Sequence, residues 1–407
     1  MESGAGPTLI RNLGACYLYL WLLYFTGSRT GIRDKVIHFA ISTATFGIMC
    51  VVFEACTLLR IVDYRKVFST RFYAPARNPD FLLDRELIYI RRPHRDSSGT
   101  VLGGDITGTF DVPSPRRYDW HMRFDQNGFR NPIDVVSAEI AVIGDSFVEG
   151  PNVGAKEMLP AVLAARLGRS VVNLGQIGYG PQQELAVLKR FGLPMCPSLV
   201  IWAFFEGNDL KNAREYETVR ANWDAFVAEG DSFWQRSFVK NALQAVERVV
   251  GHTKPSARKR SCEVPAPAGR TERLYFLYPG APLSSGDEAA IRLTGTALKE
   301  AARLTNAHGA SLLLLFVPSK YRVFASLCRP EPGTELASWT VNDMPGRIAE
   351  LVRTLEGRVS YLDLTPALRH SAQNNRLPYL SDDSHWSAEG HRVAAAAIIE
   401  HLSRQNK

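Results

Sequence analysis

The sequence predicts an α/β fold, in which a parallel sheet is flanked by helices from about residue 138 to the C-terminus. Three observations predict it. Short runs of β-branched and other apolar residues recur along this part of the chain, amphipathic patterns with a helical period fill the intervals between them, and glycine-rich turns follow several of the runs. This alternation of strand and helix is typical of a parallel sheet covered on both faces.

The individual elements follow from the local pattern. The expected strands are apolar throughout, as buried parallel strands are, and they lie at residues 140–143, 170–173, 199–205, 311–317 and 359–362. The expected helices carry apolar residues on one face, and they lie at residues 159–167, 182–191, 287–308, 342–355 and 388–403. We expect residues 138–407 to form the functional domain.

Two intervals depart from this alternation. Residues 63–137 are rich in Arg, Pro and Asp, and we interpret them as a linker or as an edge hairpin. Residues from about 211 to 286 contain an aromatic-rich helical stretch and then a basic loop. Such a long excursion at the rim of a sheet is typical of a lid over a site, so we predict a helical lid insertion here. A satellite helical unit is the alternative.

Two apolar stretches lie near the N-terminus. The first, at residues 13–26, is short, whereas the second, at residues 36–53, is long enough to cross a bilayer. We therefore expect residues 1–62 to form an N-terminal membrane segment, with its main span at about residues 36–59. Two buried helices of a soluble domain are the alternative. Basic residues lie on both sides of the second stretch, so their distribution gives no orientation.

Charge and cysteine content argue against two classes of site. The net charge is +7, but the basic residues form no face interleaved with aromatic residues, so we expect no nucleic-acid partner. No CxxC motif and no histidine cluster accompany the six cysteines, so we expect no metal and no cofactor. Cys262 and Cys328 flank part of the lid interval and the helix–strand unit after it, and they are a candidate disulfide pair in an oxidising compartment.

A serine stands directly after the first expected strand of the sheet, in Gly144-Asp145-Ser146. A buried strand that ends in a glycine turn presents the next side chain at the C-terminal rim of the sheet, where α/β proteins bind their ligands. From this stretch alone, Ser146 is a candidate nucleophile and equally a candidate N-cap of the following helix.

Three further polar stretches follow expected strands or precede the last expected helix. They contain Gly178 in a glycine-rich turn, Asn208 directly after a strand, and the pair Asp382 and Asp383 just before His385. With the serine, they supply a hydroxyl nucleophile, an imidazole base, a carboxylate to orient it and amide donors for an oxyanion. These residue types together are typical of acyl-ester chemistry.

The four stretches, in this order, resemble the SGNH (GDSL-type) hydrolase family from about residue 139 to the C-terminus, without the lid interval. The departure from the family pattern is Glu206, which replaces the first glycine of its Gly-x-Asn-Asp block. The resemblance implies a flavodoxin-like three-layer fold with Ser146 as nucleophile and His385 as base. It also implies an oxyanion hole formed by the backbone N–H groups of Ser146 and Gly178 and by the side chain of Asn208.

The carboxylate partner of His385 stays open between two residues. The family's Asp-x-x-His block selects Asp382, whereas a subset that includes alginate O-acetyltransferase-like proteins has Asp-x-His-Trp, which selects Asp383. Trp386, the phrase at residues 317–320 and a single membrane anchor also resemble that subset, so we prefer Asp383.

These features predict a serine-dependent acyl-ester hydrolase of the SGNH type that acts on an acylated glycan or a lipid ester at the cell envelope. One alternative is an O-acetyltransferase that modifies a surface polysaccharide with the same machinery. Another is a non-catalytic glycan-binding protein on the same fold. We expect the domain to be anchored to the membrane through the N-terminal helix and to lie on the extracytoplasmic, periplasmic side, since acylated envelope polymers are met there.

Overall fold

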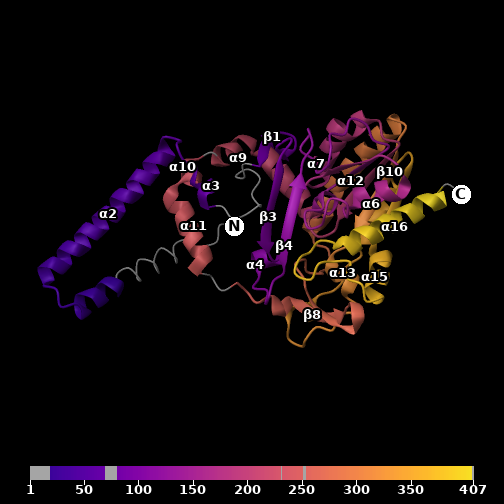
Figure 1. Cartoon of the computed structure of the whole chain (residues 1–407). Coiled ribbons are helices and arrows are strands. Elements are labelled where there is room, and N and C mark those ends of the chain that lie inside the picture. Colours follow the sequence, from indigo (N-terminus) through magenta and orange to yellow (C-terminus); the bar gives the residue numbers. More distant parts are fainter. Residues whose placement is uncertain (1–18, 69–79, 231, 251–253, 406–407) are drawn as a thin grey trace. The chain divides into compact units, whose positions relative to one another are not determined.

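The chain divides into two compact units in the computed structural model, which describes residues 19–68, 80–230, 232–250 and 254–405 (Figure 1). The N-terminal unit comprises residues 1–79 and 222–253, and the C-terminal unit comprises residues 80–221 and 254–407. The interval that we expected to form one lid is therefore shared between the two units, because its central helices pack on the N-terminal helices. A lid role for these central helices stays a prediction.

A five-stranded parallel sheet forms the centre of the C-terminal unit. Its strand order is β11-β10-β7-β5-β6, which in chain order is the 2-1-3-4-5 arrangement of flavodoxin-like folds. All five expected strands are confirmed, as β5 (Ile140–Gly144), β6 (Val171–Gly175), β7 (Leu199–Phe205), β10 (Ser311–Val317) and β11 (Val359–Asp363). The predicted fold class, with helices on both faces of a parallel sheet, is confirmed with them.

Helices cover both faces of this sheet (Figure 1). On one face α12 packs against α7, α8 and α14, and on the other α16 packs against α6 and α15. The helices are α5 (Ser146–Glu149), α6 (Leu159–Leu167), α7 (Pro181–Val187), α8 (Asp209–Ala221), α12 (Ser285–Ala307), α13 (Lys320–Phe324), α14 (Met344–Arg353), α15 (Thr365–Gln373) and α16 (Ala388–Gln405). The expected helix at 182–191 is shorter as α7, because the chain continues from Leu188 to Gly192 as a π-helical turn.

Residues 80–137 of the C-terminal unit contain two antiparallel hairpins, and each forms a two-stranded sheet separate from the central sheet. The paired strands are β1 (Phe81–Asp84) with β2 (Ile88–Arg91) and β3 (Asp96–Leu102) with β4 (Arg117–Arg123). Arg91, at the end of the first hairpin, forms a buried ion pair of 2.6 Å with Glu149 in α5. The first hairpin therefore contacts the segment that follows β5. Residues 69–79 lie outside the described part of the chain.

The N-terminal unit is built around α2 (Ile32–Leu58), which contains the expected membrane span. Among the described residues, α2 is the one helix long and apolar enough to cross a membrane. Residues 19–27 are also helical, and residues 13–18 of the first apolar stretch lie outside the described part. The other helices of this unit are α3 (Tyr64–Phe68), α9 (Trp223–Gly230), α10 (Phe233–Arg236) and α11 (Phe238–Val250).

One acidic side chain joins α2 to α11. The Glu54 carboxylate, near the end of α2, accepts hydrogen bonds from the Ser237 hydroxyl at 2.5 Å and from the Val239 N–H at 2.8 Å. The rings of Phe53 and Phe238 pack beside this contact, with their centroids 4.5 Å apart. An anion at a helix N-terminus satisfies its unpaired N–H groups, so Glu54 fixes where α11 starts.

The candidate disulfide pair is confirmed, because Cys262 and Cys328 are bonded to each other. Cys262 lies in β8 (Ser261–Pro265), which forms a hairpin with β9 (Thr271–Tyr275), and Cys328 follows α13. The bond spans a sequence separation of 66 residues. It therefore joins this hairpin to the segment that leaves the sheet after β10.

Candidate active site

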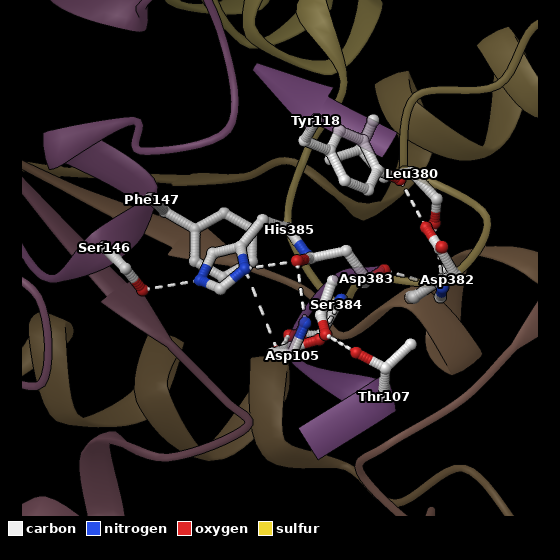
Figure 2. A network of polar contacts seen from close by, with 12 residues as sticks. Asp105, Thr107, Tyr118, Ser146, Phe147, Leu380, Asp382, Asp383, Ser384 and His385 are labelled. Carbon is white, nitrogen blue, oxygen red and sulfur yellow. Dashed lines mark hydrogen bonds and ion pairs between the residues drawn. The ribbon is translucent and has the colours of Figure 1, made fainter. Parts of the chain in front are cut away.

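Ser146 is the first residue of the short helix α5, directly after β5. The N-cap of this helix is Asp145, whose carboxylate accepts a hydrogen bond from the Phe147 N–H at 2.9 Å. Because Asp145 does the capping, the Ser146 hydroxyl is available for another partner. That partner is His385, whose Nε2 lies 2.7 Å from Ser146 Oγ (Figure 2).

The structure brings Asp383, and not Asp382, to the imidazole. His385 Nδ1 lies 2.5 Å from Asp383 Oδ1, and the His385 backbone N–H donates to the same oxygen at 2.8 Å (Figure 2). Asp382 instead accepts hydrogen bonds from the Tyr118 hydroxyl and from the Arg116 N–H. The structure therefore places Asp383 beside His385, whereas Tyr118 in β4 and Arg116 just before it hold the Asp382 carboxylate elsewhere.

Burial and charge act on these groups in opposite directions. Burial disfavours the charged imidazole of His385, but the carboxylates of Asp383, Asp105 and Asp145 outweigh it and raise the pKa of His385 to about 9. Burial likewise opposes the Asp383 carboxylate, yet the His385 charge and hydrogen bonds hold the pKa of Asp383 below its usual value. The site therefore favours an ion pair between the two side chains.

The candidate oxyanion residues lie at neighbouring strand ends. Ser146 follows β5 and Asn208 follows β7, and these adjacent strands meet where the strand order reverses, which is the usual ligand site of such sheets. A side-chain amide such as that of Asn208 has two N–H protons that can donate to a ligand.

Gly178 lies after β6 in a conformation that suits glycine. Its φ is +76°, and a Cβ atom there would lie 2.6 Å from the Tyr89 hydroxyl. The turn before it is held by Glu149, whose Oε2 accepts from the Ile177 N–H at 2.6 Å and from the Gln176 amide at 3.2 Å. Glu149 was not anticipated from the sequence, although a charged residue in the otherwise apolar stretch after Ser146 was a usable signal.

The departure at Glu206 has a structural explanation. Its carboxylate forms a buried ion pair of 2.7 Å with Arg322 and accepts a hydrogen bond from the Ser319 N–H at 2.6 Å. Glu206 therefore ties the turn after β7 to the turn after β10. Glu206 replaces the glycine of the family pattern, and its side chain adds contacts to Arg322 and Ser319.

Two further polar residues of this region, Asp209 and His391, have structural partners. Asp209 accepts a hydrogen bond from the Phe205 N–H at 2.8 Å, which stabilises the end of β7. His391 Nδ1 accepts from the Leu159 N–H at 3.1 Å, and burial lowers the pKa of His391 to about 3, so its ring is neutral. Neither side chain takes the position of the base beside Ser146.

Lys320 holds the loop that carries Asp383 and His385. Its buried ammonium donates to the backbone carbonyls of Leu380 at 2.9 Å, Ser381 at 3.1 Å and Asp383 at 2.7 Å. Burial lowers the pKa of Lys320 to about 8, against the opposing effect of nearby carboxylates. The Lys320 side chain therefore fixes the backbone on which the candidate triad depends.

We expect Lys320→Met to lower both activity and stability. The substitution leaves three buried carbonyls without their donor, and the free energy of unfolding should fall by about 3 kcal/mol. Thermal unfolding and ester turnover of the full chain measure the two effects. Lys189→Met is the matched control, because Lys189 makes a surface ion pair of 3.5 Å with Glu300 and should change little. If the two variants had the same thermal stability and the same ester turnover, this role of Lys320 would be contradicted.

Comparison with known proteins gives one family match. Residues 276–407 match the family described as SGNH hydrolase-like domain, acetyltransferase AlgX. The matched segment includes Asp383 and His385 but begins after Ser146 and Asn208. No curated protein matches the chain.

Three similar solved structures are distant from this chain. A GDSL-like lipase from Bacteroides thetaiotaomicron is 12% identical, with 65% of this chain and 88% of that chain covered and a TM-score of 0.33. An acetyl-xylooligosaccharide esterase from Geobacillus is 14% identical, with coverages of 66% and 95% and a TM-score of 0.34. A carbohydrate esterase family 2 enzyme from Corynascus is 11% identical, with coverages of 72% and 79% and a TM-score of 0.34. At this distance the likenesses say nothing about the reaction of this chain.

The family match and the sheet topology are consistent with each other. The SGNH hydrolase-like fold and the matched domain support esterase or acyltransferase activity in general. The resemblance that the motifs indicated is confirmed for residues 276–407, which match the family described as SGNH hydrolase-like domain, acetyltransferase AlgX.

Proposed function

We propose that this protein is a serine-dependent acyl-ester hydrolase with a double-displacement mechanism. The observation that carries the proposal is the unbroken hydrogen-bonded series from Ser146 Oγ to His385 Nε2 at 2.7 Å and from His385 Nδ1 to Asp383 Oδ1 at 2.5 Å. A serine hydroxyl becomes a useful nucleophile when an imidazole takes its proton and a carboxylate orients that imidazole. This geometry supplies both conditions at a strand end.

The first half of the reaction makes an acyl-enzyme. The Ser146 oxygen attacks the ester carbonyl carbon while its proton passes to His385 Nε2. The negative charge on the former carbonyl oxygen is stabilised by the N–H groups of Ser146 and Gly178 and by the Asn208 amide. The imidazolium then gives the proton to the leaving alcohol oxygen as the ester bond breaks. Each such oxyanion donor is worth about 2.7–4 kcal/mol.

The second half transfers the acyl group to water in the hydrolase. His385 takes a proton from the attacking water, the acyl carbon is released as a carboxylic acid, and the proton returns to Ser146. We propose that the substrate is an acylated glycan or a lipid ester at the cell envelope. Support comes from α2, which would keep the domain near a bilayer, and from the family match to an acetyltransferase domain.

A second candidate is an O-acetyltransferase in which a sugar hydroxyl replaces that water. The description of the matched family as an acetyltransferase favours it. The test incubates the full chain with an activated acetyl ester, with and without an oligosaccharide acceptor. Release of acetate regardless of acceptor supports the hydrolase, whereas acetylated oligosaccharide formed at the expense of acetate supports the transferase. Ser146→Ala is the control, since both reactions pass through the same acyl-enzyme.

We further propose that the C-terminal unit lies on the extracytoplasmic side of the membrane. The Cys262–Cys328 bond supports this placement, because disulfides persist in oxidising compartments. Fusions of alkaline phosphatase or of a fluorescent protein to the C-terminus test it. We expect phosphatase activity. Bright cytoplasmic fluorescence without phosphatase activity would contradict the placement, and with it an envelope glycan as substrate.

A further inference from the structure

A second carboxylate lies behind the imidazole of the candidate triad. Asp105, just before α4 (Ile106–Thr109), has an oxygen 3.8 Å from His385 Nδ1, and its side chain is 13% exposed (Figure 2). Although Asp105 occupies the N-cap position of α4, its side chain makes no capping hydrogen bond. The carboxylate is directed instead at the loop that carries His385.

Asp105 and that loop exchange hydrogen bonds in both directions. The Asp105 carboxylate accepts from the Ser384 N–H at 2.8 Å and from the Ser384 hydroxyl. The Asp105 N–H in turn donates to Asp383 Oδ2 at 2.9 Å, on the oxygen that His385 does not use (Figure 2). Three consecutive residues of the loop therefore lie against Asp105, namely Asp383, Ser384 and His385.

This close approach depends on the residue before it. A Cβ atom on Gly104 would lie 2.3 Å from the Cβ of Asp383, so only glycine lets the two backbones come this near. The same hairpin region also holds the neighbouring Asp382, through the Arg116 N–H and the Tyr118 hydroxyl. The segment from Gly104 to Tyr118 thus contacts the loop at successive residues, which a chance surface contact would not do.

On the basis of the proposed function, we propose that Asp105 is a positioning residue that holds the Asp383–His385 loop through Ser384 and places a second negative charge behind the imidazole. The charge acts through His385 and not on the substrate. It stabilises the imidazolium that forms when Ser146 gives up its proton, and the hydrogen bonds keep Asp383 in line with Nδ1.

The surroundings of Asp105 determine when this charge is present. Burial and the neighbouring Asp383 raise the pKa of Asp105 to about 6, so the carboxylate is ionised above that pH. Its charge is one of those that raise the pKa of His385 to about 9. The charged or titratable groups around these two side chains include Asp145, Tyr278, Lys320, Asp383 and His391.

The test compares the pH dependence of wild type and Asp105→Asn. Labelling of Ser146 by a fluorophosphonate probe requires neutral His385, so its rate should rise with pH through the His385 pKa. Without the Asp105 charge the pKa of His385 falls. The rising limb of the profile, which is the pH range over which labelling becomes faster, should therefore move to lower pH by about one to three pH units. The full chain in detergent is used for every variant.

Two matched variants separate charge from structure. Ser384→Ala removes one hydrogen bond to Asp105 but leaves both carboxylates, so we expect slower labelling with the limb unmoved. Asp105→Glu keeps the charge and should restore the wild-type limb. A limb in Asp105→Asn that coincides with that of wild type would overturn the proposal.

Folding of each variant is checked by its thermal melt. Where Asp105→Asn does not fold, Asp105→Ser, a smaller neutral acceptor, takes its place. Failure of both to fold would make Asp105 a residue of the fold and overturn the positioning role. Absence of any Ser146 labelling in wild type would count against the proposed function instead. A histidine NMR titration of wild type and Asp105→Asn would then still report whether Asp105 raises the pKa of His385.

Discussion

We expect Ser146→Ala to abolish ester cleavage, with kcat reduced by about 10⁶-fold. The substitution removes the atom that attacks the ester and leaves His385 with no proton to accept. Little stability should be lost, because the hydroxyl makes one close hydrogen bond, to His385, and a long one of 3.4 Å to Asp145. p-Nitrophenyl esters of graded chain length, given to the full chain, measure the activity and also report the preferred acyl group.

A control serine, two residues after His385, sharpens this result. Ser387 donates its hydroxyl to the Leu377 carbonyl at 2.6 Å and has no part in the proposed reaction, so Ser387→Ala should keep most of the activity. A fluorophosphonate probe should label wild type and fail to label Ser146→Ala. More than a small residual activity in Ser146→Ala would rule out the serine mechanism. An unlabelled wild type would favour the alternative of a glycan-binding protein without catalysis.

Asp383→Asn should lower kcat by about 10⁴-fold, the loss measured for the equivalent change in a Ser-His-Asp enzyme. The carboxylate accepts a hydrogen bond from Nδ1–H, which keeps the proton on Nδ1 and leaves Nε2 free to act as a base toward Ser146. An amide at residue 383 can present its N–H to Nδ1, which stabilises the wrong tautomer. Activity should fall while the protein stays folded, because the shape of the side chain is preserved. Ester turnover and thermal melts of the purified full chain measure the two effects.

Asp382→Asn is the matched control for that experiment. The two carboxylates are adjacent in sequence, yet Asp382 is engaged by Tyr118 and Arg116 rather than by the imidazole. We expect Asp382→Asn to lower the melting temperature more than the turnover. If Asp382→Asn instead proves the more damaging to kcat, the Asp-x-x-His assignment is correct and the preference for Asp383 must be abandoned.

The sheet could be predicted from the sequence because its signal is local. β7 and β10 are unbroken apolar runs, and a strand buried on both faces needs little else to be recognised. The hairpins between residues 80 and 123 were harder to predict, because β3 is largely exposed and contains polar residues and a glycine. α15, a helix of nine residues that begins shortly after β11, was also missed.

The site was predictable only in part. Ser146 and His385 stand in short motifs that follow a strand or precede a helix, so local sequence identifies them. The choice between Asp382 and Asp383 depends on how one turn directs two adjacent side chains, which no spacing rule decides. Asp105 gave no signal at all, because it meets Asp383 across a separation of 278 residues through the backbone of a hairpin.

The bond between Cys262 and Cys328 makes the stability of this fold depend on where the chain resides. Closing a loop of 66 residues restricts the unfolded chain and is worth about 4 kcal/mol. A single domain has only about 5–15 kcal/mol in total, so a chain retained among cytoplasmic reductants would unfold more often and be exposed to proteolysis. Molecules that fail to reach an oxidising compartment would then be removed before they could cleave cytoplasmic esters.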